Sequence, residues 1–171
     1  YPAYGTTDFR LPALEILQEN GSRLTNFTYE SHRIFAGKPG LKGLPATYTE
    51  REEEADTLEI TLKDRLLNMT LVLLYTIFAG ESAVARSARF ENHGEAPVYV
   101  TRAMSLSVDL PDSDYDWIQF SGAWSRERQV KTRRLEQGIQ AVNSTRGHSS
   151  HNHNPFIVLK RPTADEFQGE A

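Results

Sequence analysis

Three histidines lie close together near the end of the chain, at His148, His151 and His153. A catalytic zinc ion takes three protein ligands, and a His-x-His pair on a strand directs both rings to the same side. No Asp or Glu stands beside them, and their neighbours are mainly Ser and Asn. This composition favours a hydrogen-bonded polar loop, so we predict no metal and no other cofactor.

Three aspartates alternate at Asp112, Asp114 and Asp116, as at the start of a calcium loop. An EF-hand loop also needs Gly at its sixth position and Glu at its twelfth, which here are Trp117 and Ala123. The calcium pattern therefore fails, and a solvated acidic turn is expected. Two of these carboxylates could serve glycoside hydrolysis, but nothing in their spacing fixes the separation of about 5 Å that a retaining pair needs.

No other catalytic motif is present. The chain has no G-x-S-x-G elbow, no Gly-rich phosphate loop and no dinucleotide-binding fingerprint. We therefore predict that this chain carries no catalytic residue of its own.

Aromatic and basic residues gather in the stretch that follows the aspartates. The aromatic residues of this stretch are Tyr115, Trp117, Phe120 and Trp124. Two basic residues, Arg126 and Arg128, follow closely in the sequence. Aromatic faces next to charged groups suit sugar recognition, because ring faces stack and hydroxyls accept charge-assisted hydrogen bonds. Trp and Arg are also enriched in cores and interfaces, which is the preferred interpretation.

The elements that must position these residues follow a period of two, typical of strands. Asn20-Gly21 predicts a hairpin between a strand at 14–18 and a strand at 24–29. Strands are expected at 57–63, 83–90 and 98–108, with 67–78 as a central strand that is buried on both faces. The stretch 124–137 could form a helix, but its flanking glycines favour strand. Three loops interrupt the strands, at 37–45, 109–117 and 144–155.

Composition sets limits on function. The 171 residues carry a net charge of −4, 39% hydrophobic residues and no cysteine. A nucleic-acid or anionic-membrane surface needs clustered basic charge, and a bilayer span needs about 20 apolar residues, so neither is expected. Absence of cysteine is consistent with a cytoplasmic location.

Six stretches of the chain carry recognisable motifs in order: residues 4–10, 31–48, 86–92, 114–117, 122–128 and 149–156. In these stretches the chain resembles family-36 glycoside hydrolases, the bacterial α-galactosidases. This resemblance implies a parent enzyme that hydrolyses melibiose- and raffinose-type α-galactosides by a retaining mechanism. It also implies that residues 1–171 are a single domain, a truncated part of the N-terminal β-supersandwich, with the catalytic barrel absent.

The resemblance implies partners and site residues as well. Family members are often oligomers in which this domain packs on barrels and shapes the rim of a neighbour's active site. Asn152 departs from the Gln that is usual in the family, which leaves His151 and Asn154 as the better candidates for fixed loop hydrogen bonds.

We therefore expect an all-β fold, a large antiparallel β-sandwich with few or no helices. Its expected role is that of a non-catalytic domain of an α-galactosidase. The candidates for the substrate rim or an interface are Trp117, Trp124, Arg126, Arg128, His151 and Asn154. An autonomous carbohydrate-binding module is the alternative, and a metal-dependent β-sandwich enzyme is a third hypothesis.

Overall fold

The computed structural model describes residues 3–4, 11–43 and 45–167 of the chain. Residues 5–10 and 44, which belong to two of the stretches that carry the family resemblance, lie outside this range. The chain divides into two compact units, Tyr1–Val108 and Asp109–Ala171. The expectation of a single domain stays a prediction, because compactness alone does not say whether the units fold independently.

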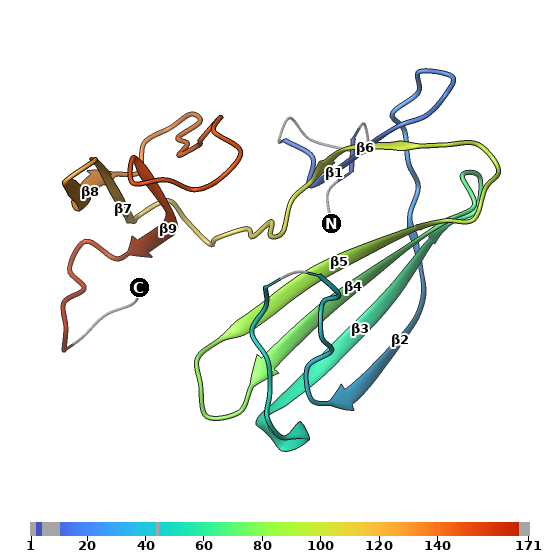
Figure 1. Cartoon of the computed structure of the whole chain (residues 1–171), viewed down its shortest axis with the longest axis horizontal. Helices are drawn as coiled ribbons and strands as arrows, with labels where there is room; N and C mark the ends of the chain where they lie inside the picture. The colour runs from blue at the N-terminus through green and yellow to red at the C-terminus, as the bar shows by residue number, and fades with distance from the viewer. Residues whose placement is uncertain (1–2, 5–10, 44, 168–171) are drawn as a thin grey trace. The chain divides into compact units, whose positions relative to one another are not determined.

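The first unit is built on a four-stranded antiparallel sheet (Figure 1). Its order β2-β3-β4-β5 is that of a meander, as the sequence predicted, with the bounds Thr28–Ala36, Ala55–Asp64, Met69–Phe78 and Val84–Asn92. The strand β4 is central and apolar on both faces, with Met69, Leu71 and Leu73 on one side and Val72 and Leu74 on the other. This confirms the prediction of a central buried strand.

A two-stranded sheet packs on one face of this meander. It pairs β1 (Leu14–Leu17) with β6 (Tyr99–Ala103). Leu14 and Ile16 of β1 form the core cluster together with Met69, Leu71 and Leu73 of β4. The arrangement of two antiparallel sheets around one apolar layer is sandwich-like, so the predicted fold class is confirmed.

Two local predictions about this unit are wrong. The turn at Asn20-Gly21 forms, with Gly21 at φ 81° and its N–H donating to the carbonyl of Gln18 at 2.9 Å. The strands on either side do not pair, however, because β1 pairs with β6 and β2 begins only at Thr28. The strand expected at 98–108 ends at Ala103, which pairs with Leu14, the first residue of β1.

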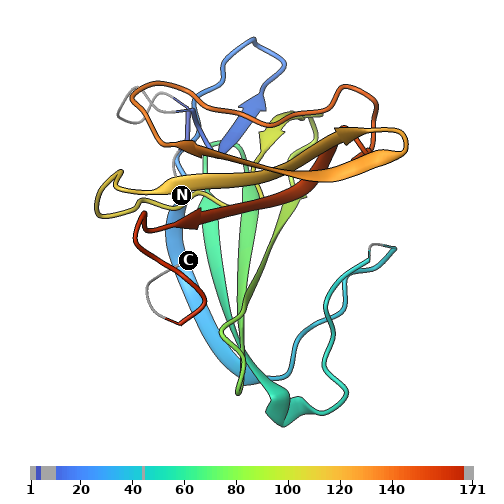
Figure 2. The same ribbon diagram turned by 90° about the vertical axis from the view of Figure 1, so that its left-hand side faces the viewer.

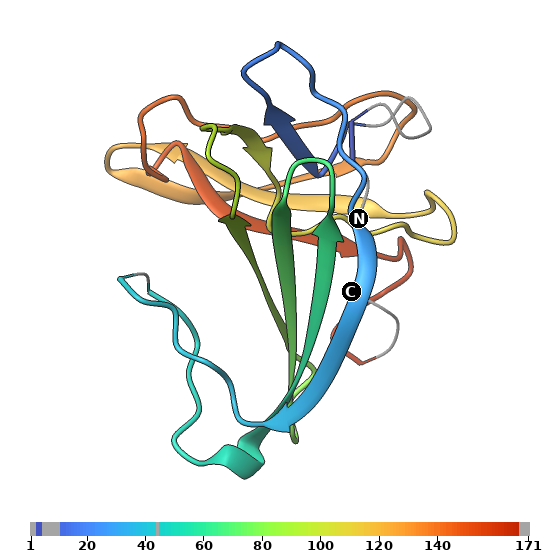
Figure 3. The same cartoon turned by 90° about the vertical axis from the view of Figure 1, so that its right-hand side faces the viewer.

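Between β2 and β3 the chain forms a long connection that extends away from the sheet, with residues 37–43 and 45–51 described (Figure 3). It ends in a single 3-10 turn, η1 (Glu52–Glu54). The described part of the chain contains no α-helix. Among the same residues, no helix is long and apolar enough to cross a membrane.

The second unit is a three-stranded antiparallel sheet of order β8-β7-β9 (Figure 2). Its strands are β7 (Asp116–Ala123), β8 (Arg126–Arg134) and β9 (His153–Lys160). The stretch 124–137 is thus largely strand, which confirms the choice of strand over helix. The expected loop at 144–155 ends earlier, at the start of β9. Of the described hydrophobic residues in this unit, only Tyr115 is buried, at 8% exposure.

Candidate functional site

The β7–β8 hairpin has an unusual backbone at its tip. Trp124 and Ser125 form the turn, and Trp124 is 80% exposed. Ser121 pairs with Gln129 while Ala123 pairs with Arg126, so Glu127 and Arg128 together face Gly122 in a bulge. Arg128 takes the left-handed conformation at φ 55° and Ser125 does so at φ 64°. Such conformations cost a non-glycine residue about 1–2 kcal/mol, so the fold holds Arg128 in place against strain.

Gly122 makes the bulge possible. A Cβ atom at this position would lie 2.4 Å from the carbonyl oxygen of Arg126 and 2.9 Å from the Cα of Glu127. No side chain fits there, so glycine is required by close approach of the two strands. The N–H of Gly122 also donates to the carbonyl of Asn152 at 3.2 Å, which ties the histidine-rich loop to the hairpin.

That loop and the bulge enclose a hollow of about 270 Å³. Three of the six predicted site residues line it: Arg128, His151 and Asn154. The rest of the lining consists of Glu127, Ser149, Ser150 and Pro155. Arg128 comes from the bulge of β8, His151 from the loop and Asn154 from the start of β9. The structure thus brings together side chains that are up to 26 positions apart in the sequence.

A second hollow of about 250 Å³ shares Ser149, Asn154 and Pro155 with the first and is also lined by His148 and His153. Among the residues that line these two hollows, two buried polar atoms have no hydrogen-bond partner in the described part of the chain: His153 Nδ1 and Asn154 Oδ1. An unpaired buried acceptor costs about 1–3 kcal/mol. Both atoms belong to residues that line these hollows, so this end of the sheet carries unused hydrogen-bonding capacity.

The other predicted site residues lie apart from the hollow. Trp124 and Arg126 are exposed at the adjoining hairpin tip. Trp117 lies at the opposite end of β7, where the guanidinium of Arg133 sits 4.8 Å from its ring centroid and its Nε1–H donates to Gln119 at 2.8 Å. One face of Trp117 is therefore already covered, and Trp124 is the freer of the two indoles.

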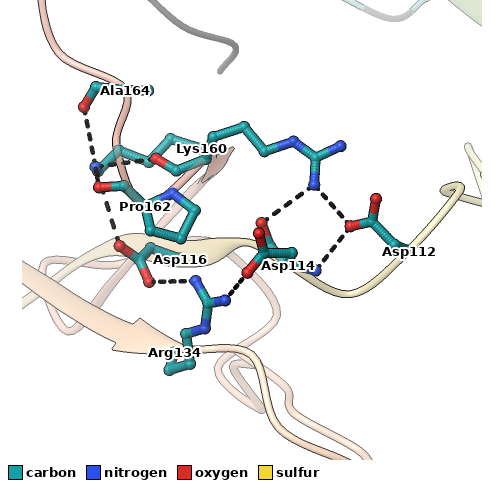
Figure 4. A network of polar contacts seen from close by, with 8 residues as sticks. Asp112, Asp114, Asp116, Arg134, Lys160, Pro162 and Ala164 are labelled. Carbon is teal, nitrogen blue, oxygen red and sulfur yellow. Dashed lines mark hydrogen bonds and ion pairs between the residues drawn. The ribbon is translucent and has the colours of Figure 1, made fainter.

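The three aspartates take part in an ion-pair network (Figure 4), and Asp112 and Asp114 remain exposed, as expected of a solvated acidic turn. Arg134 pairs with both Asp114 and Asp116, the latter at 3.3 Å, and Lys160 lies 4.0 Å from Asp116. Arg161 donates to Asp112 at 2.6 Å. Each of the three carboxylates therefore has at least one cationic partner.

The same network encloses the buried residue of the unit. The Arg161 guanidinium lies 4.0 Å from the ring centroid of Tyr115, and it also donates to the carbonyl of Asp114 at 3.2 Å. Lys160 donates to the carbonyls of Pro162 and Ala164 at 3.4 and 3.1 Å (Figure 4). The segment that enters β7 is thereby tied to the segment that leaves β9.

The three histidines do not converge. Within the described part of the chain, no three His, Cys, Asp or Glu side chains are arranged to hold a metal ion. The Nδ1 atom of His148 bonds to the carbonyl of Arg146 at 3.1 Å, and His151 and His153 line different hollows. The donor set at this loop therefore suits hydrogen bonding to a polar partner.

Sequence reasoning missed several residues that build this unit. Gly122 was noted only as a flank, although it fixes the bulge that presents Arg128. Arg133, Arg134 and Arg161 were not singled out, although they cover Trp117 and neutralise the aspartates. The adjacent basic pairs at 133–134 and 160–161 were a signal that could have indicated them, because a cluster of aspartates needs cations nearby.

The described residues form an all-β fold, and one end of its three-stranded sheet carries a polar hollow that is lined by three of the predicted site residues. Residues 1–171 match the family described as the glycosyl hydrolase family 36 N-terminal domain. The chain belongs to this family, which confirms the resemblance seen in its motifs.

Known relatives agree with this assignment. The chain is 54% identical to the α-galactosidase AgaA of Geobacillus stearothermophilus over 99% of its length, and 40% identical to the α-galactosidase Mel36A of Lactobacillus acidophilus over all of it. It spans 23% of the length of each of these curated relatives.

Solved structures agree as well. The crystal structure of AgaA matches with a TM-score of 0.96, covering 99% of this chain and 24% of that one. A variant of AgaA solved in complex with raffinose matches with the same TM-score, identity and coverage. The α-galactosidase of Lactobacillus brevis, 41% identical, matches with a TM-score of 0.92 over 95% of this chain and 22% of that one.

Proposed function

We propose that this chain is the non-catalytic N-terminal part of an α-galactosidase that hydrolyses terminal α-galactosides of the melibiose and raffinose type. The observation that carries the proposal is the match of the whole chain to the N-terminal domain of family 36, at 54% identity to an α-galactosidase. The chain spans 23% of that relative, so the catalytic acids belong to the remainder of the longer protein.

Within that enzyme, the second unit serves packing on the catalytic barrel, oligomerisation and the shaping of the active-site rim. The exposed Trp124, the strained bulge and the polar hollow support this role. Exposed aromatic side chains and Arg are the usual anchors of interfaces, and backbone strain gathers at functional sites. The residues that we assign to the rim or interface are Trp117, Trp124, Arg126, Arg128, His151 and Asn154. The absence of cysteine supports a cytoplasmic enzyme.

The test is a comparison of activities. The longer protein that contains this chain is expected to release galactose from melibiose and raffinose and to be inhibited by 1-deoxygalactonojirimycin, which is bound in a solved relative. The 171 residues alone are expected to show no release above background. A longer protein that is folded and inactive on both sugars would reject the assignment, and so would full activity of the 171 residues alone.

Trp124 offers a sharper test of the rim or interface role. Truncation of a central aromatic anchor costs 2 kcal/mol or more in typical interfaces. Trp124→Ala is therefore expected to weaken subunit association or to raise KM, while Val130→Ala, another exposed residue of the same hairpin at 61%, leaves both unchanged. Equal behaviour of the two variants would contradict the role assigned to the hairpin tip.

A further inference from the structure

Three residues around the hollow of 270 Å³ carry polar groups that have no partner in the described part of the chain. Arg128 and His151 make no side-chain hydrogen bond or ion pair with any described residue, and Asn154 Oδ1 is buried without one. Among the described residues of this unit, the cations at 133, 134, 160 and 161 are engaged with carboxylates, carbonyls or rings, whereas those at 126, 131 and 146 make no such contact. The hollow differs from those exposed positions because it combines unused donors with an unused acceptor that is buried.

The fold maintains this arrangement at a cost. Arg128 is held at φ 55° where glycine would be relaxed, and Gly122 is required for the bulge that places it. A surface arginine with no ligand would gain nothing from this conformation. The strain is accounted for if the guanidinium must point to a ligand in the hollow.

The lining also indicates the class of ligand. Glu127 and Arg128 both line the hollow, so opposite charges lie near each other, although one carboxylate oxygen of Glu127 also accepts from the N–H of Ser125 at 2.8 Å. An anion would be repelled by Glu127 and a cation by Arg128. Serine hydroxyls, the imidazole of His151 and the amide of Asn154 offer both donors and acceptors. A neutral molecule with several hydroxyl groups satisfies this set.

We propose that this hollow binds one sugar unit of an oligosaccharide, with Arg128 and His151 donating to its hydroxyl oxygens and Asn154 Oδ1 accepting from a hydroxyl. This inference rests on the proposed function, which supplies saccharides as the neutral polyols that the enzyme meets. It goes beyond that function because it assigns a built saccharide site to this chain itself, independent of stacking on Trp117 or Trp124.

The test is calorimetric titration of the longer enzyme with raffinose while its catalytic site is saturated with 1-deoxygalactonojirimycin. One additional class of sites of millimolar affinity is expected for the native protein. Arg128→Gly removes the guanidinium and keeps the bulge, and Asn154→Ala removes the acceptor. Each is expected to weaken this binding about tenfold or more, as loss of one buried or charged hydrogen bond does. Lys131→Ala, on the same strand but outside the hollow, is the matched control and leaves binding unchanged.

Several results would overturn the proposal. These are no additional sites at all, additional sites that both variants retain, or competition of inorganic phosphate for the same sites, which would show an anion site. Failure of the proposed function is read separately, because it appears as absent hydrolysis and absent inhibition in the activity assay, whatever the titration shows.

Discussion

Replacement of Arg128 by glycine is expected to make the domain more stable. Arg128 takes φ 55° in the bulge opposite Gly122. Relief of that conformation stabilises the folded state by about 1–2 kcal/mol. The greater backbone freedom of glycine in the unfolded chain lowers the stability by about 0.5–1 kcal/mol. The net gain is up to about 1.5 kcal/mol, which corresponds to a rise in Tm of up to about 6 °C for a protein of this size. Chemical and thermal denaturation of the chain measure both quantities.

The control is Arg126→Gly, in the same strand. Arg126 is also exposed, but its φ is not positive, so glycine relieves no strain there. That variant is expected to lose about 0.5–1 kcal/mol. If Arg128→Gly destabilises the chain as much as Arg126→Gly does, the bulge holds no strain and the reasoning that links it to function is wrong.

Three further predictions concern packing and charge. A double-mutant cycle of Arg161→Met with Asp112→Asn is expected to give a coupling energy of about 0.2–1 kcal/mol, because the two side chains are 23% and 48% exposed. A coupling energy of zero in denaturation experiments would contradict a stabilising ion pair. Gly122→Ala places a Cβ 2.4 Å from a carbonyl and is expected to cost about 1–3 kcal/mol, and an unchanged midpoint in urea would contradict the close approach. A hydrogen bond from Arg33 lowers the pKa of Glu59 in the folded protein. The ionised Glu59 carboxylate therefore contributes to stability above its unfolded pKa of about 4.3, and this contribution is lost as pH falls through the folded pKa. The Glu59→Gln variant is therefore expected to lose less stability than the native chain between neutral and acid pH. Identical pH profiles of unfolding free energy for the variant and the native chain would refute this prediction.

Local patterns predicted the meander well and failed where pairing is non-local. The alternation at 57–63 and the apolar run at 67–78 correspond to β3 and β4, because adjacent strands joined by short turns pair as their sequence order suggests. The turn at Asn20-Gly21 was recognised, but the partner of β1 is β6, far along the chain. Burial of Leu14 and Ile16 against β4 decides that pairing, and a local turn signal does not contain it.

The site was predictable in residue type and not in arrangement. Trp124, Arg128, His151 and Asn154 were recognised as candidates, but their grouping depends on the two-for-one register opposite Gly122. A shift of one residue changes which side chains share a face of a sheet, so the hollow could not be derived from alternation alone. The pairing of the aspartates with Arg134, Lys160 and Arg161 likewise depends on the β7–β8 and β7–β9 registers.

The role proposed for the second unit is tested most directly by hydrogen exchange of the backbone amides at 122–128 and 144–152, measured in the 171 residues alone and in the longer protein that contains them. If the hairpin tip and the histidine-rich loop dock on the barrel or on a sister subunit, these amides are expected to exchange more slowly in the longer protein, while those of β3 and β4 change little. Equal exchange of the tip and the loop in both proteins would contradict the account.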